Sequence, residues 1–151
     1  MKSSILISVY ISILAFYGCE NKSEKINTHK ITFGAHSAVT PVPQPPLSWN
    51  AFWMPRHQSI VDRVKQGNVD LIFIGDSITH FWDRPDQGKE IWETYYAKRN
   101  ALNMGFAGDQ TQHVLWRLQN GEIAGIEPKL AILMIGTNNS GPNTAQEIGE
   151  G

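Results

Sequence analysis

The chain has 151 residues, with 13 basic and 14 acidic side chains and a formal net charge of -1. This length holds one domain with flanking segments, and the lack of a basic surplus argues against a nucleic-acid partner. Hydrophobic residues make up 41% and charged residues 18%, which excludes wholesale disorder. Cys19 is the only cysteine, so an intrachain disulfide is excluded, and no Cys/His spacing is typical of a zinc site.

Residues 1–19 have the pattern of an export signal. Lys2 precedes an apolar run at 5–17, which is shorter than the ~20 residues that cross a bilayer, and Gly18 and Cys19 follow it. Cys19 occupies the position of the lipidated cysteine in a bacterial lipoprotein signal; an ordinary secretory signal and a cytosolic chain are the alternatives. We expect an exported protein, either secreted or a periplasmic or cell-envelope lipoprotein, that contacts the membrane only through a lipid anchor at Cys19.

Residues 20–50 are predicted to form a proline-rich linker. Residues 20–25 are polar, and four prolines cluster between 41 and 46 without an apolar period. Proline favours extended, hydrated backbone and is excluded from inner strands and helix interiors. The folded domain is therefore expected to span residues 51–151.

Three short apolar runs in residues 51–151 predict parallel strands. They begin at residues 69, 101 and 130, and a spacing of about 30 residues is that of strand–helix–strand crossovers. The first and third runs are nearly continuous, as in strands that are covered on both faces.

Helix-like segments precede and separate these runs. The first is bounded by Pro55 and Gly67, and the third is expected to begin at an N-cap formed by Asp109 or Thr111. The apolar stripes of the three helices are Ile60, Val61 and Val64; Ile91, Trp92, Tyr95 and Tyr96; and Val114, Leu115 and Leu118. The pattern predicts an α/β fold: a doubly wound parallel sheet with helices on both faces.

A glycine and small polar residues follow each predicted strand, at 75–79, 105–111 and 136–139. Ligands of such sheets bind at the carboxyl ends of the strands. Ser77 is a candidate nucleophile whose backbone N–H could also bind an oxyanion. Gly108 has no side chain to block its N–H, and Asn138 offers an amide donor. One nucleophile with three donors suits acyl transfer.

Each of these residues also has a structural interpretation. Ser77 alone is most often a helix N-cap, and Asn138 could cap a turn. Asp76 is expected to fix its turn by accepting backbone N–H groups. Asp109 is expected to cap a helix, with a loop or substrate contact as the alternative.

Two histidines and several tryptophans are weaker candidates. His80 and His113 follow the candidate loops closely, but packing or surface roles are favoured over a general base, which must reach the hydroxyl. Tryptophans at helical spacing are more often core residues than walls of a sugar or acyl pocket. The nucleotide-binding motifs G-x-G-x-x-G and G-x-x-x-x-G-K-S/T are absent, which argues against a nucleotide-binding domain.

The blocks Gly75-Asp76-Ser77, Gly108 and 136–139 resemble the first three blocks of the GDSL/SGNH hydrolase family. The segments 103–109 and 113–122 are most similar to its platelet-activating-factor acetylhydrolase catalytic-subunit branch. The resemblance implies a flavodoxin-like sheet, with Ser77 as the nucleophile. It also implies an oxyanion hole formed by the Ser77 N–H, the Gly108 N–H and the Asn138 side chain. It implies no metal or organic cofactor and a small ester substrate, which for an exported member is expected to be an acetylated carbohydrate or another small ester.

The fourth family block, Asp-x-x-His, supplies the general base and its carboxylate, and nothing in this sequence matches it. We therefore expect the chain to be the N-terminal part of a longer, truncated protein and to be nearly inactive by itself, since a serine without a base is a weak nucleophile. The alternative is a non-catalytic module that binds acyl or sugar ligands on the same scaffold.

Overall fold

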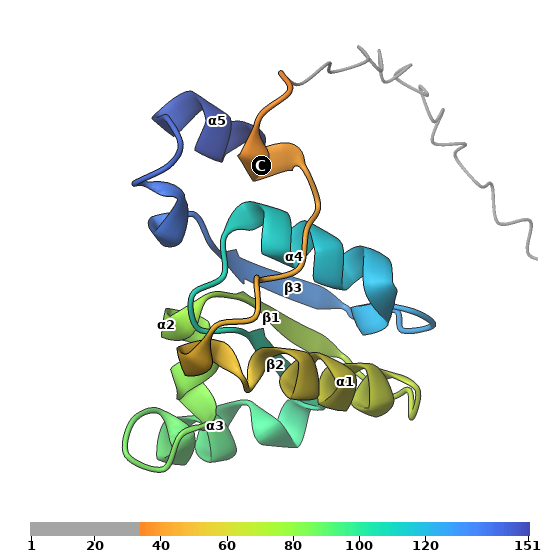
Figure 1. Cartoon of the computed structure of the whole chain (residues 1–151). Helices are drawn as coiled ribbons and strands as arrows, with labels where there is room; N and C mark the ends of the chain where they lie inside the picture. The colour runs from red at the N-terminus through yellow and green to blue at the C-terminus, as the bar shows by residue number, and fades with distance from the viewer. Residues whose placement is uncertain (1–33) are drawn as a thin grey trace, which may run out of the picture. The chain divides into compact units, whose positions relative to one another are not determined.

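A three-stranded parallel sheet forms the centre of the fold in a computed structural model that describes residues 34–151 (Figure 1). The strands are β1 (Leu71–Gly75), β2 (Ala101–Gly105) and β3 (Leu130–Met134), in the order β2-β1-β3. All three lie within the apolar runs of the sequence or one residue beyond them. The predicted α/β class, with a parallel sheet between helices, is confirmed.

Helices alternate with the strands as expected. They are α1 (Trp53–Val64), α2 (Ser77–His80), α3 (Lys89–Tyr95), α4 (Thr111–Arg117) and α5 (Ala145–Glu150). The N-cap position of α4 is Gln110, not Asp109 or Thr111. The prediction failed because Asp109 is fully buried and its carboxylate is occupied by other donors, so it is unavailable to the helix terminus.

The alternation of side chains along β1 and β2 divides the packing between two faces. On one face, Ile72 and Ile74 join the core formed with α1 and α4. On the opposite face, the Phe73 ring meets Trp92 and Tyr96 edge-on, with centroids 5.1 and 4.9 Å apart. The residues of the first core are Trp53, Ile60, Val64, Val69, Ile72, Ile74, Leu102, Met104, Phe106 and Val114.

β3 differs from the other strands because all five of its residues are exposed. Leu133 is 62% exposed and Leu130 is 56% exposed. The strand pairs with β1 on one side only, and within residues 34–151 the packing leaves both of its faces open. The expectation that this apolar run is covered on both faces is therefore wrong for the part of the chain described here. An open, apolar edge of this kind is a surface on which further chain can pair.

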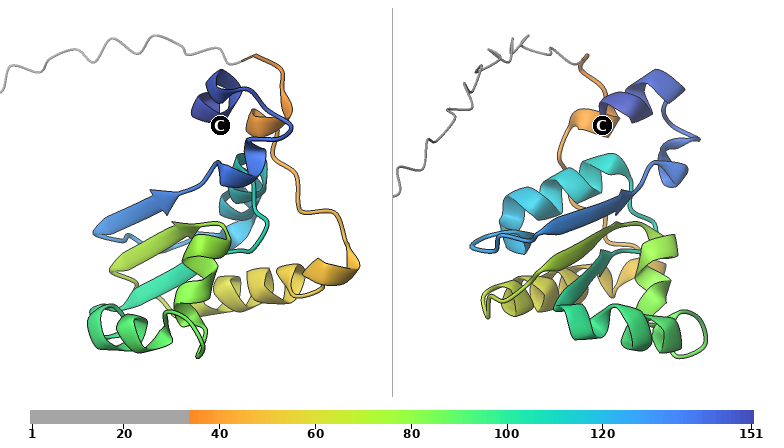
Figure 2. Two further views of the ribbon diagram at one scale, coloured as in Figure 1. Left: turned by 90° about the vertical axis from the view of Figure 1, so that its left-hand side faces the viewer. Right: turned by 180° about the vertical axis from the view of Figure 1, so that it is seen from behind.

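Residues 40–50, which we call the strap, lie against the domain near the carboxyl ends of the strands (Figure 2). Gln44 is 6% exposed; its Nε2 donates to Asp109 Oδ1 at 2.8 Å and to the Ala107 carbonyl at 3.1 Å. Its Oε1 accepts from Asn50 Nδ2 at 2.8 Å. Ala38, just before the strap, is fully buried. From residue 34 onward the predicted linker is therefore anchored to the domain at the buried residues Ala38, Gln44 and Asn50, although most of its other residues are exposed.

The export signal at residues 1–19, the anchor at Cys19 and the first part of the linker lie outside the described residues and stay predictions. Among residues 34–151, the structure contains no helix that has both the length and the apolar character needed to cross a bilayer.

The contacts of Gln44 predict that Gln44→Ala destabilises the protein by about 1–3 kcal/mol, because a buried carboxylate and a buried amide each lose a partner. Urea unfolding at pH 7 measures this change. Gln58→Ala is the matched control, since Gln58 is exposed and bonds only to Asp62 of its own helix; it should change the free energy of unfolding by less than about 0.5 kcal/mol. Equal effects of the two substitutions would show that the strap does not stabilise the fold.

Candidate functional site

The register of the sheet brings three loops to one edge. Gly75 pairs with Gly105 of β2 and with Met134 of β3, so the three strands end level with one another. The Phe106 N–H donates to the Gly75 carbonyl at 3.0 Å, which extends the pairing into the second loop. A side chain at Gly105 would collide with the backbone nitrogen of His80, so glycine is required for the close approach of β2 and α2.

Ser77 is the first residue of α2, two residues after β1 ends. The preceding Asp76 is the N-cap, and its Oδ1 accepts the Ile78 N–H at 2.9 Å. The turn-fixing role predicted for Asp76 is confirmed, whereas the interpretation of Ser77 as the cap itself is wrong. Within residues 34–151, neither the backbone N–H nor the hydroxyl of Ser77 makes a hydrogen bond. Both groups are therefore unoccupied at the edge of the sheet, and the side chain is only partly buried.

Gly108 lies at the turn of the loop after β2. Its φ is +80°, a conformation that favours glycine. An added Cβ would come within 2.6 Å of Cη2 of Trp49, so the missing side chain also admits the strap. In the described part of the chain, the Gly108 N–H donates no hydrogen bond.

Asn138 and Asn139 have different environments in the loop after β3. Asn138 is partly exposed, and its Nδ2 donates one hydrogen to the Asp109 carbonyl at 2.8 Å, which leaves the second hydrogen of the amide. Asn139 is fully buried; its Oδ1 accepts the Thr111 N–H at 2.9 Å, and its Nδ2 donates to Thr111 Oγ1 at 3.2 Å. Asn139 therefore holds the start of α4, while Asn138 joins the second loop to the third.

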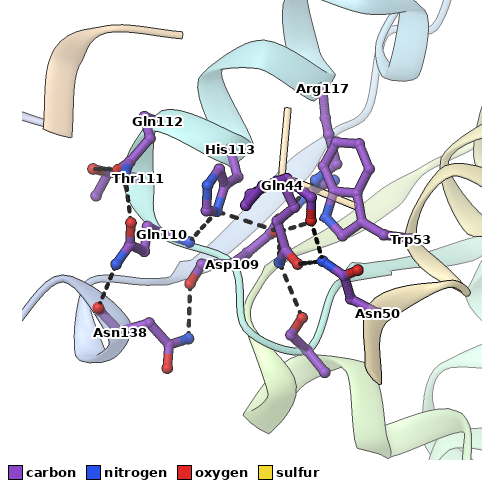
Figure 3. A network of polar contacts seen from close by, with 12 residues as sticks. Gln44, Asn50, Trp53, Asp109, Gln110, Thr111, Gln112, His113, Arg117 and Asn138 are labelled. Carbon is purple, nitrogen blue, oxygen red and sulfur yellow. Dashed lines mark hydrogen bonds and ion pairs between the residues drawn. The ribbon is translucent and has the colours of Figure 1, made fainter. Parts of the chain in front are cut away.

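A buried ionic network is centred on Asp109, the residue after Gly108 (Figure 3). Asp109 Oδ2 accepts from Arg117 Nε at 2.8 Å, and Oδ1 accepts from Trp53 Nε1 at 2.7 Å. Arg117 also pairs with Glu122, whose other oxygen lies 2.8 Å from His57 Nδ1. Burial raises the pKa of Asp109 to about 6, against the opposing effects of Arg117 and the donated hydrogen bonds. This network was not predicted, because its contacts to Trp53 and His57 join residues 56 and 65 positions apart, and such contacts leave no periodic signal in the sequence.

The two histidines near the site both accept hydrogen bonds from the Gly108 loop. His80 Nδ1 accepts the Ala107 N–H at 3.1 Å, and His113 Nδ1 accepts the Gln110 N–H at 3.0 Å. A backbone N–H can only donate, so each ring is neutral with its proton on Nε2. The 3.8 Å approach of His113 Nδ1 to Asp109 is too long for a hydrogen bond. Burial lowers the pKa of both imidazoles to about 4, with Arg56 and Arg117 respectively adding to the shift.

A lowered histidine pKa predicts loss of stability in acid. The unfolded imidazoles protonate near pH 6.5 and the folded ones near pH 4, so His80 and His113 stabilise the fold above about pH 6.5 and lose this contribution as pH falls toward 4. Asp109 acts in the opposite direction, because its pKa is raised on folding. The double variant His80→Gln/His113→Gln retains Asp109, so its stability should fall less than that of the wild type between pH 7 and 4.5. Urea unfolding across this range tests the difference, and parallel curves would contradict it.

The described residues contain no cluster of three or more His, Cys, Asp or Glu side chains that could hold a metal ion. The functional groups at the strand ends are instead a serine hydroxyl, unpaired backbone N–H groups and an amide. Such groups bind the carbonyl oxygen and the developing negative charge of an acyl compound.

Comparison with known proteins is consistent with this chemistry. Residues 73–150 match the GDSL-like lipase/acylhydrolase family. The chain is 42% identical over 99 residues to platelet-activating factor acetylhydrolase IB subunit alpha2 of Homo sapiens, covering 66% of this chain and 41% of the relative. It is 39% identical over 111 residues to subunit alpha1 from Bos taurus, covering 74% and 46%. The chain thus spans less than half the length of these curated relatives. From the match over residues 73–150 and these identities, the chain belongs to the GDSL-like lipase/acylhydrolase family.

Proposed function

We propose that the chain carries the nucleophile and the oxyanion-binding groups of a serine-dependent carboxylic ester hydrolase. Ser77 Oγ bonds to the acyl carbonyl carbon as its proton leaves, the ester C–O bond breaks, and the leaving oxygen takes up a proton to depart as the alcohol; water then hydrolyses the acyl-enzyme and restores the serine hydroxyl. The tetrahedral oxyanion accepts hydrogen bonds from the N–H groups of Ser77 and Gly108 and from the free Nδ2 hydrogen of Asn138. The observation that carries the proposal is that, within residues 34–151, neither backbone donor makes a hydrogen bond and both lie on loops that leave the sheet at one level.

The substrate we propose is a small ester, with an acetyl or other short acyl group. Relatives of the chain are named as acetylhydrolase subunits, which supports a short acyl group. An acetylated carbohydrate or another small alcohol provides the leaving group. Preorganised donors of this kind are each worth about 3–4 kcal/mol of transition-state stabilisation in other enzymes.

We further propose that the 151-residue polypeptide turns over esters slowly, because neither of the described histidines beside the strand-end loops, His80 and His113, is free to act as a general base. The other two described histidines lie outside these loops: His36 precedes the strap and bonds to Glu150 at 2.8 Å, and His57 belongs to α1 and bonds to Glu122 at 2.8 Å. The Nδ1 atoms of His80 and His113 accept backbone hydrogens, and their Nε2 atoms already carry protons. A serine hydroxyl without a base is a weak nucleophile near neutral pH.

Hydrolysis of p-nitrophenyl acetate by the purified chain is expected to be close to the rate of its Ser77→Ala variant. Fluorophosphonate labelling should still modify Ser77 slowly and be lost in Ser77→Ala. Ser140→Ala is the matched control, since this exposed serine bonds only to the Thr137 carbonyl; its labelling should equal that of the wild type.

Rapid ester turnover that depends on Ser77 would overturn the proposed lack of a base. Ligand binding with no labelling of Ser77 would instead favour the alternative, a non-catalytic module on the same scaffold. The observation that favours that alternative is that, within residues 34–151, neither histidine beside the strand-end loops is free to act as a base.

A further inference from the structure

A small pocket lies between the strap and the loop after β2, with a volume of about 230 Å³. The strap contributes Leu47 and Trp49, the loop contributes Gly108 and Gln110, and α4 contributes His113. Trp49 is 58% exposed, yet its ring packs against Gly108. A Cβ added to Gly108 would lie only 2.6 Å from Cη2 of Trp49. The pocket therefore borders one of the proposed oxyanion donors.

Most polar side chains of the pocket are already paired within the chain (Figure 3). The Gln44 and Asn50 side chains bond to each other and to neighbouring carbonyl, carboxylate and N–H groups. Gln110 Nε2 donates to the Asn138 carbonyl at 2.7 Å. These contacts leave the side chains of Gln44, Asn50 and Gln110 with few hydrogen-bond donors or acceptors that a ligand could use.

His113 is the exception. Its Nδ1 accepts the Gln110 N–H, so the proton is on Nε2. The residue is 7% exposed, and among residues 34–151 its Nε2 has no hydrogen-bond partner, although the atom is not sealed from solvent. His113 lines the pocket, and its Nε2–H is a largely buried donor that has no protein partner among residues 34–151. Such a donor is suited to bind an acceptor oxygen on a ligand.

We propose that this pocket binds the alcohol part of the ester, and that this alcohol is a sugar ring. The apolar face of a pyranose packs on the Trp49 indole, a large aromatic surface with one wet side. A ring or hydroxyl oxygen of the sugar accepts the His113 Nε2–H. The orientation of the ester toward Ser77 rests on the proposed function, whereas binding of the sugar requires no turnover.

A larger hollow of about 480 Å³ is less suited to this role. Its lining residues all belong to the segment 43–54, and none comes from the loops after the strands. Its polar members are the paired side chains of Gln44 and Asn50. This hollow provides a control, because Met54 lines it and does not line the proposed sugar site.

The test is an NMR titration of the Ser77→Ala chain with methyl 6-O-acetyl-glucopyranoside. Trp49→Ala should weaken binding about tenfold, whereas Trp49→Phe keeps an aromatic face and should stay within about threefold. Met54→Ala, at a residue that is 52% exposed, should leave the Kd unchanged. The His113 Nε2 resonance should shift on binding, a signal that a purely structural role of the histidine would not give.

A second probe, cyclohexylmethyl acetate, has the ring size and ester of the first but lacks its ring and hydroxyl oxygens. Equal affinity for both probes would overturn the assignment of a sugar. Unchanged binding in Trp49→Ala, or equal losses in Trp49→Ala and Met54→Ala, would overturn the assignment of the pocket. Fluorophosphonate labelling of Ser77 without sugar binding would defeat this inference alone. Sugar binding without labelling would support it and defeat the proposed esterase chemistry.

Discussion

The fully buried guanidinium of Arg117 holds the loop on which the candidate site depends. Its Nε bonds to Asp109 at 2.8 Å, a second nitrogen pairs with Glu122, and a third donates to the Met104 carbonyl at the end of β2 at 3.2 Å. The Phe106 ring lies 3.9 Å from the guanidinium carbon. Removing ions from water is costly, so such a network is weak evidence of stability in itself. Its geometric effect is clearer, because it ties α4 to the last residues of β2 and to Asp109, the residue after Gly108.

Asp109 extends this constraint to the rest of the domain. One carboxylate oxygen faces α4, while the other accepts from Trp53 of α1 and Gln44 of the strap. Helix α1, helix α4 and the strap thus meet at Asp109, the residue after Gly108. Donors that are already oriented need no reorganisation when charge develops, which is the main source of their effect in acyl transfer. The buried ion pairs therefore serve the site by fixing the backbone of the loop.

The parts predicted correctly from sequence are those with local signals. Apolar runs about 30 residues apart marked the strands, and the turn role of Asp76 followed from its place between a strand and a helix. The strap was missed because proline-rich sequence lacks periodicity, and its attachment depends on a few contacts such as those of the buried Gln44 amide and of the Val42 N–H with the Gln112 carbonyl. The exposure of β3 was missed for another reason: an apolar run signals a preference for burial, but what covers the strand depends on the other chain segments available to it. Asp109 resembled a cap because capping and ion pairing use the same side chain.

His80 and His113 hold the backbone of the Gly108 loop, and the hydrogen bonds by which they do so prevent them from acting as a general base. His80 lies three residues beyond Ser77, but its Nδ1 accepts the Ala107 N–H one residue before Gly108. A general base must take up a proton and release it during each cycle. Nε2 is already protonated, and taking the proton on Nδ1 would break the hydrogen bond that shapes the Gly108 loop. His113 has the same constraint through Gln110. The neutral imidazoles thus maintain the loop because they do not titrate near pH 7, and this property makes them unsuitable as the base.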